Sequence, residues 1–359
     1  MKFSDVLEIK NGKNQKQVEN PNGKYPIYGS GGIMGYADDY ICEPYTVIIG
    51  RKGTINNPIF VETPFWNVDT AFGLQAKKDI LLPKYLYYFC VHFDFETLNT
   101  TVTIPSLTKA NLLNVDIPIP PIAEQNKIVN TLTTVDTLIQ TKKEQLAFLD
   151  ELVKSRFIEM FGNDDYPSEP LNNNVIEMFI GPFGSSLKNE YFVDESDGYC
   201  MVYEQKHAIQ KTMNVPTRYV PKSKYEELKR FTVFGGDIIV SCRGTIGEVY
   251  TVPFDAPMGI MHPSIMKIRL DTNKYNQKFF VFALEQYMNE HNAEAKGSGV
   301  KMAVSATVLG QSDFVIPPME VQNQFAEFVE QTDKSKLAVQ KTLEELEELK
   351  KSLMQEYFG

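Results

Sequence analysis

The chain has 359 residues, of which 43% are apolar and 12% aromatic, enough to build two or three packed domains and too many for a disordered protein. No run of eighteen apolar residues occurs, and the segment Met1–Asp5 turns polar at once, so we expect neither a membrane span nor a secretory signal.

The formal net charge of −10 is spread over the whole chain, and residues 318–359 carry five basic and nine acidic side chains. A local basic patch can still bind DNA, but this balance predicts weak DNA binding by the chain alone. The four cysteines, Cys42, Cys90, Cys200 and Cys242, form no CxxC motif and no cluster with histidine. We therefore expect no zinc site and a reducing cytoplasm.

The first part of the chain is predicted to form short strands and turns, including a β-rich run at Tyr45–Gly50. A helix that begins after Pro83 is predicted at Lys84–Val91. A long helix is predicted over residues 120–162. The same order then recurs, with a strand at Asp237–Ser241, a helix at Lys278–Met288 and a second long helix over 317–359.

The two long segments each begin at a proline pair and carry apolar residues in a rhythm of four and three, which is typical of a coiled coil. We expect the two helices to pack against each other antiparallel. The alternative is ordinary bundle helices that each bury one stripe. The seam and docking residues that we select are Gln125, Leu132, Ile139, Leu146, Leu149, Gln322, Val339, Leu343 and Leu346.

The sequence is a duplication. Residues 120–162 and 317–359 align without a gap and share 14 of 43 residues, including the pairs Gln125/Gln322 and Phe161/Phe358. Toward the start of each copy, the difference in residue number between matching positions falls from 197 to 169. The second copy therefore carries insertions in its loops. This pattern fits two modules that share a scaffold but read different ligands.

The duplicated order resembles the specificity subunits of type I restriction–modification enzymes. The residues that carry the resemblance are Ile117-Pro118-Ile119-Pro120-Pro121 leading to Glu124-Gln125, Val315-Ile316-Pro317-Pro318 leading to Gln322, Tyr25-Pro26-Ile27-Tyr28-Gly29, and Ser155-Arg156-Phe157 leading to Phe161-Gly162. The second copy has Val321 where the first has Glu124, a small departure. The resemblance covers essentially the whole chain.

The resemblance implies an α+β fold with two globular target-recognition domains, at 1–119 and 163–316, joined by two long antiparallel coiled-coil helices at 120–162 and 317–359, with an internal pseudo-two-fold repeat. Each domain would read one half of a gapped, two-part target on double-stranded DNA. Two methylase subunits would dock mainly on the helices, and two restriction (motor) subunits would join through them. The chain itself would be non-catalytic and bind no cofactor: S-adenosylmethionine would belong to the methylase, and ATP with Mg²⁺ to the motor subunit.

DNA-contact candidates fall in two groups. The Gly-flanked basic turns with Arg51, Lys52, Thr54, Arg243 and Thr245 suit phosphate or guanine contact, although a turn that recurs in both copies could equally be structural scaffold. Segments where the copies differ are better candidates for sequence reading, each open to the alternative of an ordinary exposed loop. They contribute Tyr28, Ser30, Thr100, Thr101, Thr103, Ser185, Ser186, Lys188, Tyr203, His207, Lys296, Ser298 and Lys301, the last three in a basic loop before the second long helix.

Two other classes of function remain open on sequence grounds. Asp194 with Glu204-Gln205-Lys206 resembles the acid…Glu-x-Lys pattern of metal-dependent nucleases, so a self-sufficient or accessory endonuclease is the first alternative. A coiled-coil scaffold that never touches DNA is the second, and it predicts that exchanging the recognition domains leaves DNA modification unchanged.

Overall fold

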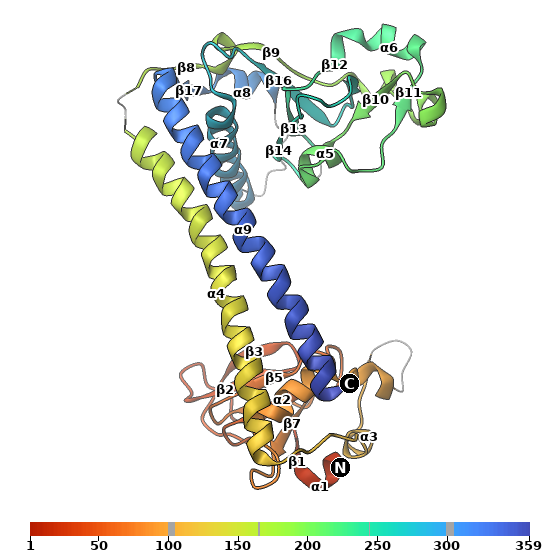
Figure 1. The fold of residues 1–359 in the computed structure, drawn as a ribbon, viewed down its shortest axis with the longest axis vertical. Coiled ribbons are helices and arrows are strands. Elements are labelled where there is room, and N and C mark those ends of the chain that lie inside the picture. Colours follow the sequence, from red (N-terminus) through yellow and green to blue (C-terminus); the bar gives the residue numbers. More distant parts are fainter. Residues whose placement is uncertain (100–104, 164–165, 244, 299–304) are drawn as a thin grey trace. The chain divides into compact units, whose positions relative to one another are not determined.

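The structure, a computed structural model, describes residues 1–99, 105–163, 166–243, 245–298 and 305–359, and for residues 292–298 it describes the backbone alone. The chain forms two compact units. The first unit comprises Met1–Ala147 with Leu337–Gly359, and the second unit comprises Phe148–Lys336. Each unit therefore combines a globular module with one segment from each of two long helices, α4 (Ile122–Phe161) and α9 (Met319–Phe358) (Figure 1).

The first module is built on a four-stranded antiparallel sheet. Its strand order is β1-β7-β4-β5, and a second sheet has the order β3-β2-β6. Every residue of β4 is buried, as its Val47-Ile48-Ile49 run predicts for a strand in the middle of a sheet. The bounds are α1 (Phe3–Val6), β1 (Leu7–Asn11), β2 (Tyr25–Gly29), β3 (Gly32–Ala37), β4 (Thr46–Gly50), β5 (Ile59–Val61), β6 (Trp66–Asn67), β7 (Ala71–Ala76), α2 (Pro83–His92), η1 (Phe95–Leu98) and α3 (Lys109–Leu113).

The second module repeats the main sheet of the first in the same strand order. Its main sheet has the order β14-β13-β16-β9, which matches β5-β4-β7-β1, and the parallel pair β10·β15 matches the parallel pair β2·β6. The bounds are β8 (Ser168–Pro170), η2 (Leu171–Asn173), β9 (Val175–Ile180), η3 (Gly184–Ser186), η4 (Asn189–Tyr191), η5 (Glu195–Asp197), β10 (Cys200–Tyr203), α5 (Gln205–Gln210), β11 (Tyr219–Val220), α6 (Lys222–Leu228), η6 (Lys229–Phe231), β12 (Thr232–Val233), β13 (Ile238–Ser241), β14 (Val249–Thr251), β15 (Gly259–Met261), β16 (Ile265–Leu270), α7 (Gln277–Ser298), α8 (Ala306–Gln311) and β17 (Asp313–Val315).

The insertions predicted for the second copy are visible in this comparison. They supply α5, α6 and the extra strand β12, which extends the small sheet to the order β11-β10-β15-β12. One prediction is corrected: the helix expected at Lys278–Met288 extends through Ser298, so Lys296 and Ser298 belong to its last turn rather than to a loop.

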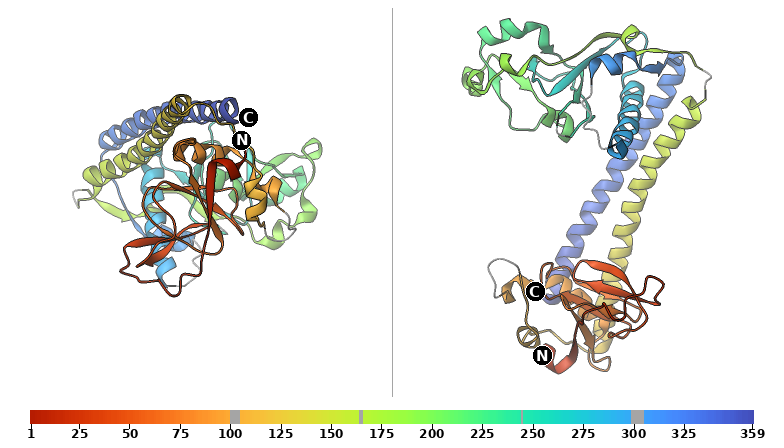
Figure 2. Two further views of the ribbon diagram at one scale, coloured as in Figure 1. Left: turned by 90° about the horizontal axis from the view of Figure 1, so that it is seen from below. Right: turned by 180° about the vertical axis from the view of Figure 1, so that it is seen from behind.

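The long helices pack side by side and antiparallel within each unit (Figures 1 and 2). In the first unit Lys350 Nζ lies 2.6 Å from Asp136 and Lys143 Nζ lies 3.0 Å from Glu347, so numbers rise along one helix as they fall along the other. In the second unit Lys336 Nζ lies 2.6 Å from Asp150. The predicted fold class is thereby confirmed.

The heptad positions form the seam. Ile139 and Leu343 are buried together with Val135, and Leu146 and Leu346 pack against them. Leu132 is fully buried in the core of the first module, while Leu149 and Val339 are half-buried. In the described part of the chain, no helix is both long enough and apolar enough to cross a membrane.

The Phe-Gly ends of the long helices close the two cores. Phe358, at the end of α9, packs its ring 5.1 Å from that of Tyr85 and 6.0 Å from that of Phe89 on α2. Phe161, at the end of α4, lies 4.8 Å from Phe279 on α7. Each module is thus completed by the end of the helix that begins in the other copy.

A buried glutamine at the start of each long helix fixes the short helix of its module. Gln125 Oε1 accepts from the N–H of Leu82, the N-cap of α2, and its Nε2 donates to the carbonyls of Ile80 and Pro120 at 2.9 Å each. Gln322 repeats the arrangement, accepting from the N–H of Asn276 and donating to the carbonyls of Lys274 and Pro317.

Both glutamine side chains are fully buried. Every polar atom of each amide has a partner inside its own unit, so the prediction that Gln125 and Gln322 dock a partner subunit is corrected to a structural role.

We predict that Gln125→Ala and Gln322→Ala each lower the free energy of unfolding by about 2–4 kcal/mol, because buried donors and acceptors lose their partner. The matched controls are Gln140→Ala and Gln340→Ala, exposed glutamines on the same helices that each bond only to a glutamate one turn on, and these should change it by less than about 0.5 kcal/mol. Urea unfolding followed by circular dichroism measures both. Equal effects of the buried and exposed substitutions would contradict the assigned role.

Candidate nucleic-acid interface

Four strands, β2, β4, β6 and β7, meet at one end of the first module. The carbonyl of Tyr28, in β2, accepts from the N–H of Val68, just after β6, at 2.9 Å. The N–H of Arg51, just after β4, donates to the carbonyl of Thr70, just before β7, at 2.7 Å. Ser30 lies against Gly50 at the end of β4. The structure therefore brings the predicted residues Tyr28, Ser30 and Arg51 into one loop cluster.

The basic turn of this cluster has a structural backbone and exposed side chains. The N–H of Gly53 donates to the carbonyl of Pro105, and the carbonyl of Arg51 accepts from the N–H of Leu107. Arg51, Lys52 and Thr54 are nevertheless exposed. The two interpretations of this turn, scaffold and contact, are therefore compatible, because one belongs to its backbone and the other to its side chains.

The second module has the same convergence. The N–H of His262 donates to the carbonyl of Tyr203, and the N–H of Cys242 donates to the carbonyl of Ser264, both at 2.8 Å. Arg243 and Thr245 are exposed on the turn after β13, as Lys52 and Thr54 are on the turn after β4.

Both modules also need a glycine where the first strand of the main sheet leads into this cluster. A Cβ at Gly12 would overlap the carbonyl of Val68, and a Cβ at Gly181 would overlap the carbonyl of His262. The two loop clusters thus share one backbone frame, meaning the glycine after the first strand of the main sheet and the backbone hydrogen bonds that join the strand ends.

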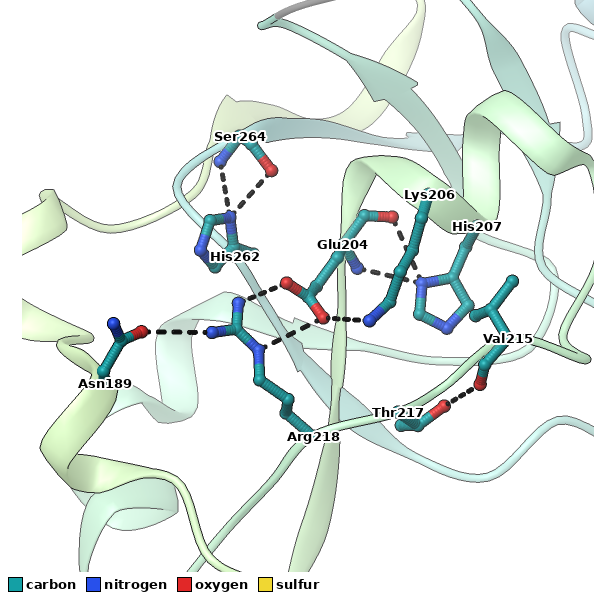
Figure 3. A network of polar contacts seen from close by, with 9 residues as sticks. All are labelled: Asn189, Glu204, Lys206, His207, Val215, Thr217, Arg218, His262 and Ser264. Atoms are coloured by element: carbon teal, nitrogen blue, oxygen red, sulfur yellow. Dashed lines mark hydrogen bonds and ion pairs between the residues drawn. The ribbon is translucent and has the colours of Figure 1, made fainter. Parts of the chain in front are cut away.

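A charged network occupies the loop cluster of the second module (Figure 3). The Glu204 carboxylate follows β10 and is only 10% exposed, and it accepts from Arg218 through both Nε and Nη2 and from Lys206 Nζ at 2.8 Å. Arg218 Nη1 also donates to Asn189 Oδ1 at 3.3 Å. Within this network two cationic side chains, Arg218 and Lys206, surround one carboxylate, which favours an acceptor-rich ligand.

Burial and charge set the protonation of this network. Burial raises the pKa of Glu204, but the hydrogen bonds from Arg218 and Lys206 outweigh it and hold that pKa below the ordinary value. Burial lowers the pKa of His262; the charge of Glu204 raises it, and the charges of Arg218 and Arg243 lower it. The pKa is lowered on balance, so the imidazole is neutral near pH 7. Its Nδ1 accepts from the N–H of Ser264 at 3.2 Å.

Two predicted base-reading residues are corrected. Tyr203 and His207 are both fully buried. The Tyr203 hydroxyl donates to the carbonyl of Pro257 at 2.7 Å, and His207 Nδ1 accepts from the N–H of Glu204 at 3.0 Å. Neither side chain can meet a DNA base in this structure, and both stabilise the loops around Glu204 instead.

The other candidates are distributed as follows. Ser185 and Ser186 lie in η3, and exposed Lys188 is followed directly by Asn189, which reaches the network. Thr100, Thr101, Thr103 and Lys301 lie outside the described residues, and so do the side chains of Lys296 and Ser298. Sequence reasoning missed Arg218 altogether and noticed Glu204 and Lys206 only as part of a nuclease pattern.

The nuclease pattern does not form a metal site in the described part of the chain. There, no group of three or more His, Cys, Asp or Glu residues is placed to hold a metal ion. The Glu204 carboxylate, which the pattern would assign to Mg²⁺, is instead bound to Arg218 and Lys206. This geometry gives the endonuclease alternative no support.

Comparison with known proteins gives the family. Residues 1–149 and 199–350 match the type I restriction modification DNA specificity domain. The chain is 25% identical to the putative type I restriction enzyme MjaX specificity subunit of Methanocaldococcus jannaschii, over 98% of this chain and 90% of that protein. It is 27% identical to the putative type I restriction enzyme specificity subunit S.HindORF215P of Haemophilus influenzae, over 73% of this chain and 70% of that protein.

Solved structures agree on the fold. The S subunit of a type I restriction–modification system from M. genitalium superposes with a TM-score of 0.60 at 17% identity, covering 100% of this chain and 95% of that one. A chain from a study of the assembly and conformational transition of the type I R-M system gives 0.65 at 15% identity, covering 99% and 96%. The chain belongs to the family of type I restriction–modification DNA specificity domains, and it carries that domain twice.

We predict that Lys52→Ala and Arg243→Ala weaken DNA binding across all sequences. Each exposed cation that contacts a phosphate contributes about one unit to the slope of log K against log salt concentration, so each substitution should reduce that slope by about 1. The control is Lys77→Ala, because Lys77 is exposed just beyond the opposite end of β7 and donates to the carbonyl of Asp5. Titrations at several salt concentrations measure the slope, and an unchanged slope for both variants would exclude this turn from the interface.

Proposed function

We propose that this chain is the DNA-recognition subunit of a type I restriction–modification complex and that each module reads one half of a gapped, two-part DNA target. The observation that carries the proposal is the repeated loop cluster. Both modules hold it on the same backbone frame, yet the side chains differ: Gly29 follows Tyr28 in the first, and Glu204 follows Tyr203 in the second. A shared frame with different polar groups suits two half-sites of different sequence.

The long helices are proposed to hold the two modules at a fixed spacing and to dock methylase subunits. Large apolar side chains remain exposed on them beside the filled seam. Leu337 is 72% exposed in the first unit, and Phe148 and Ile158 are 65% and 66% exposed in the second. Exposed apolar residues on a helix pair whose seam is already packed favour a further helical partner. Motor subunits would join through the methylase.

The proposed chemistry of the complex lies outside this chain. S-adenosylmethionine would be bound by the methylase, and ATP with Mg²⁺ by the motor subunit, while this chain supplies binding and orientation. The four cysteines are free and buried, which supports the expectation of a reducing compartment.

The spacing role can be tested by lengthening both helices. One heptad inserted after Ala147 and one after Lys336, where the two units meet along the chain, adds about 10 Å to each helix. At ~3.4 Å per base pair, we predict that the gap between the half-sites grows by about three base pairs while the half-sites stay the same. Methylation mapping of cells that express the lengthened chain with its methylase measures the gap.

A heptad inserted in α4 alone is the control for this experiment. It makes α4 longer than α9 and displaces the paired residues of the seam, so it should abolish methylation and not merely change the gap between the half-sites. An unchanged gap in the doubly lengthened chain would contradict the spacing role.

A further inference from the structure

Arg218 is held in place more firmly than the other exposed cations of its loop cluster. Its guanidinium stacks over the Phe192 ring with 3.8 Å between the guanidinium carbon and the ring centre. Glu204 binds it from one side and Asn189 from another, yet 33% of the Arg218 side chain stays exposed. An arginine that is stacked and paired in this way loses little conformational entropy on binding a ligand.

Donors remain on this guanidinium. Arginine has five N–H donors, and the contacts to Glu204 and Asn189 use three of them among the described residues. Two N–H groups are therefore left for a ligand. A pair of fixed N–H groups is the arrangement that binds a phosphate or the O6 and N7 atoms of guanine in the major groove.

The surroundings of Arg218 favour guanine over phosphate. Arg218 borders an open groove that is also lined by Asp194, Glu195 and Asp197. These carboxylates repel a phosphate, whereas the O6 and N7 atoms of guanine are neutral acceptors and pay a much smaller penalty. Arg243, on the neighbouring turn, is exposed and remains the candidate for a phosphate contact.

Among its described residues, the first module has no equivalent of this carboxylate–arginine pair. The strand pairing sets Tyr28 beside Asn67 and Tyr203 beside Met261, so Glu204 occupies the position of Gly29. With no carboxylate at that position, the first module cannot fix an arginine in the same way. Any effect of this network is therefore confined to one half of the target.

Resting on the proposed function, we infer that Arg218 reads a guanine in the half-site of the second module and that Glu204 is its positioning residue. Lys206 completes the pairing of the Glu204 carboxylate, so that the carboxylate does not repel the DNA. The ligand is a purine edge with two neighbouring acceptors.

The experiment uses the complex of the full chain with its methylase on its own target. The half-site of the second module is first identified by replacing residues 163–316 with the matching segment of a relative. Each guanine of that half-site is then replaced, one at a time, by 7-deazaguanine, which lacks the N7 acceptor. A bidentate contact contributes about 5- to 150-fold in affinity, and 7-deazaguanine removes one of its two hydrogen bonds, so the wild-type complex should lose part of that factor at one guanine.

Arg218→Ala, which removes both hydrogen bonds, should lose the full factor on the unmodified target and should then be insensitive to 7-deazaguanine at that guanine. Glu204→Gln should lose part of the discrimination at the same base, with the first half-site unaffected. Arg218→Lys keeps the charge but loses the planar guanidinium that Glu204 and Phe192 hold in place, so it should recover only part of the affinity that Arg218→Ala loses. Glu285→Gln is the matched control, because Glu285 pairs with Lys211 at 2.6 Å in the same unit, and it should change nothing.

Three results would overturn the inference. The first is a uniform weakening by Arg218→Ala with a smaller salt slope and no dependence on the base, which would make Arg218 a phosphate contact. The second is a loss at a guanine of the first half-site. The third is continued sensitivity of Arg218→Ala to 7-deazaguanine at the same guanine. If the chain directs no methylation to any gapped target, the proposed function fails before this test begins, so the two failures are distinguishable.

Discussion

The packing of each long helix's last turn into the module of the other copy is the constraint on which the rest of the structure depends. The end of α9 contributes Phe358 to the core of the first unit, where it packs against Tyr85. The end of α4 contributes Phe161 to the core of the second unit, where it packs against Phe279. Neither module therefore has a complete core from its own residues, and the buried glutamines Gln125 and Gln322 fix the short helices that receive these ends. Because each long helix completes a core with its last turn, it must run through both units. A helix that ended early would leave one core open to water.

Because the helix ends complete the cores, the residues of the two loop clusters can differ between the modules. Stability resides in the sheets, the short helices and the seam, which are the same in both copies, while the loop clusters lie at the ends of strands whose pairing is already fixed. Gly12 and Gly181, Tyr28 and Tyr203, and the basic turns belong to the frame. The residues that follow Tyr28 and Tyr203 are not constrained by it. A duplicated protein can thus carry a glycine at that position in one module and the Glu204 network in the other.

Much of the fold could be predicted from the sequence, because its signals are local. The heptad rhythm, the proline pairs and the repeated Phe-Gly ends predicted the two antiparallel helices and the duplication. Side-chain direction was not predictable in this way. Tyr203 and His207 look like exposed polar groups in a divergent segment, yet the first ends a buried strand and the second accepts from the backbone of Glu204.

The polar network escaped prediction for a related reason. Arg218 is separated from Glu204 by 14 residues and joins it through a loop, so no spacing in the sequence marks the pair. Gln125 was selected as a seam or docking residue of the long helix, whereas its side chain bonds the N-cap of α2. Both cases depend on which face a polar side chain presents, which is decided by tertiary packing.

The most direct measurement of the central claim is genome-wide methylation mapping in cells that express the methylase of the same type I system with and without this chain. The account predicts that a split motif with an unread gap gains methylation only when the chain is present. Methylation of that motif regardless of the chain, or no gapped motif in either case, would contradict it.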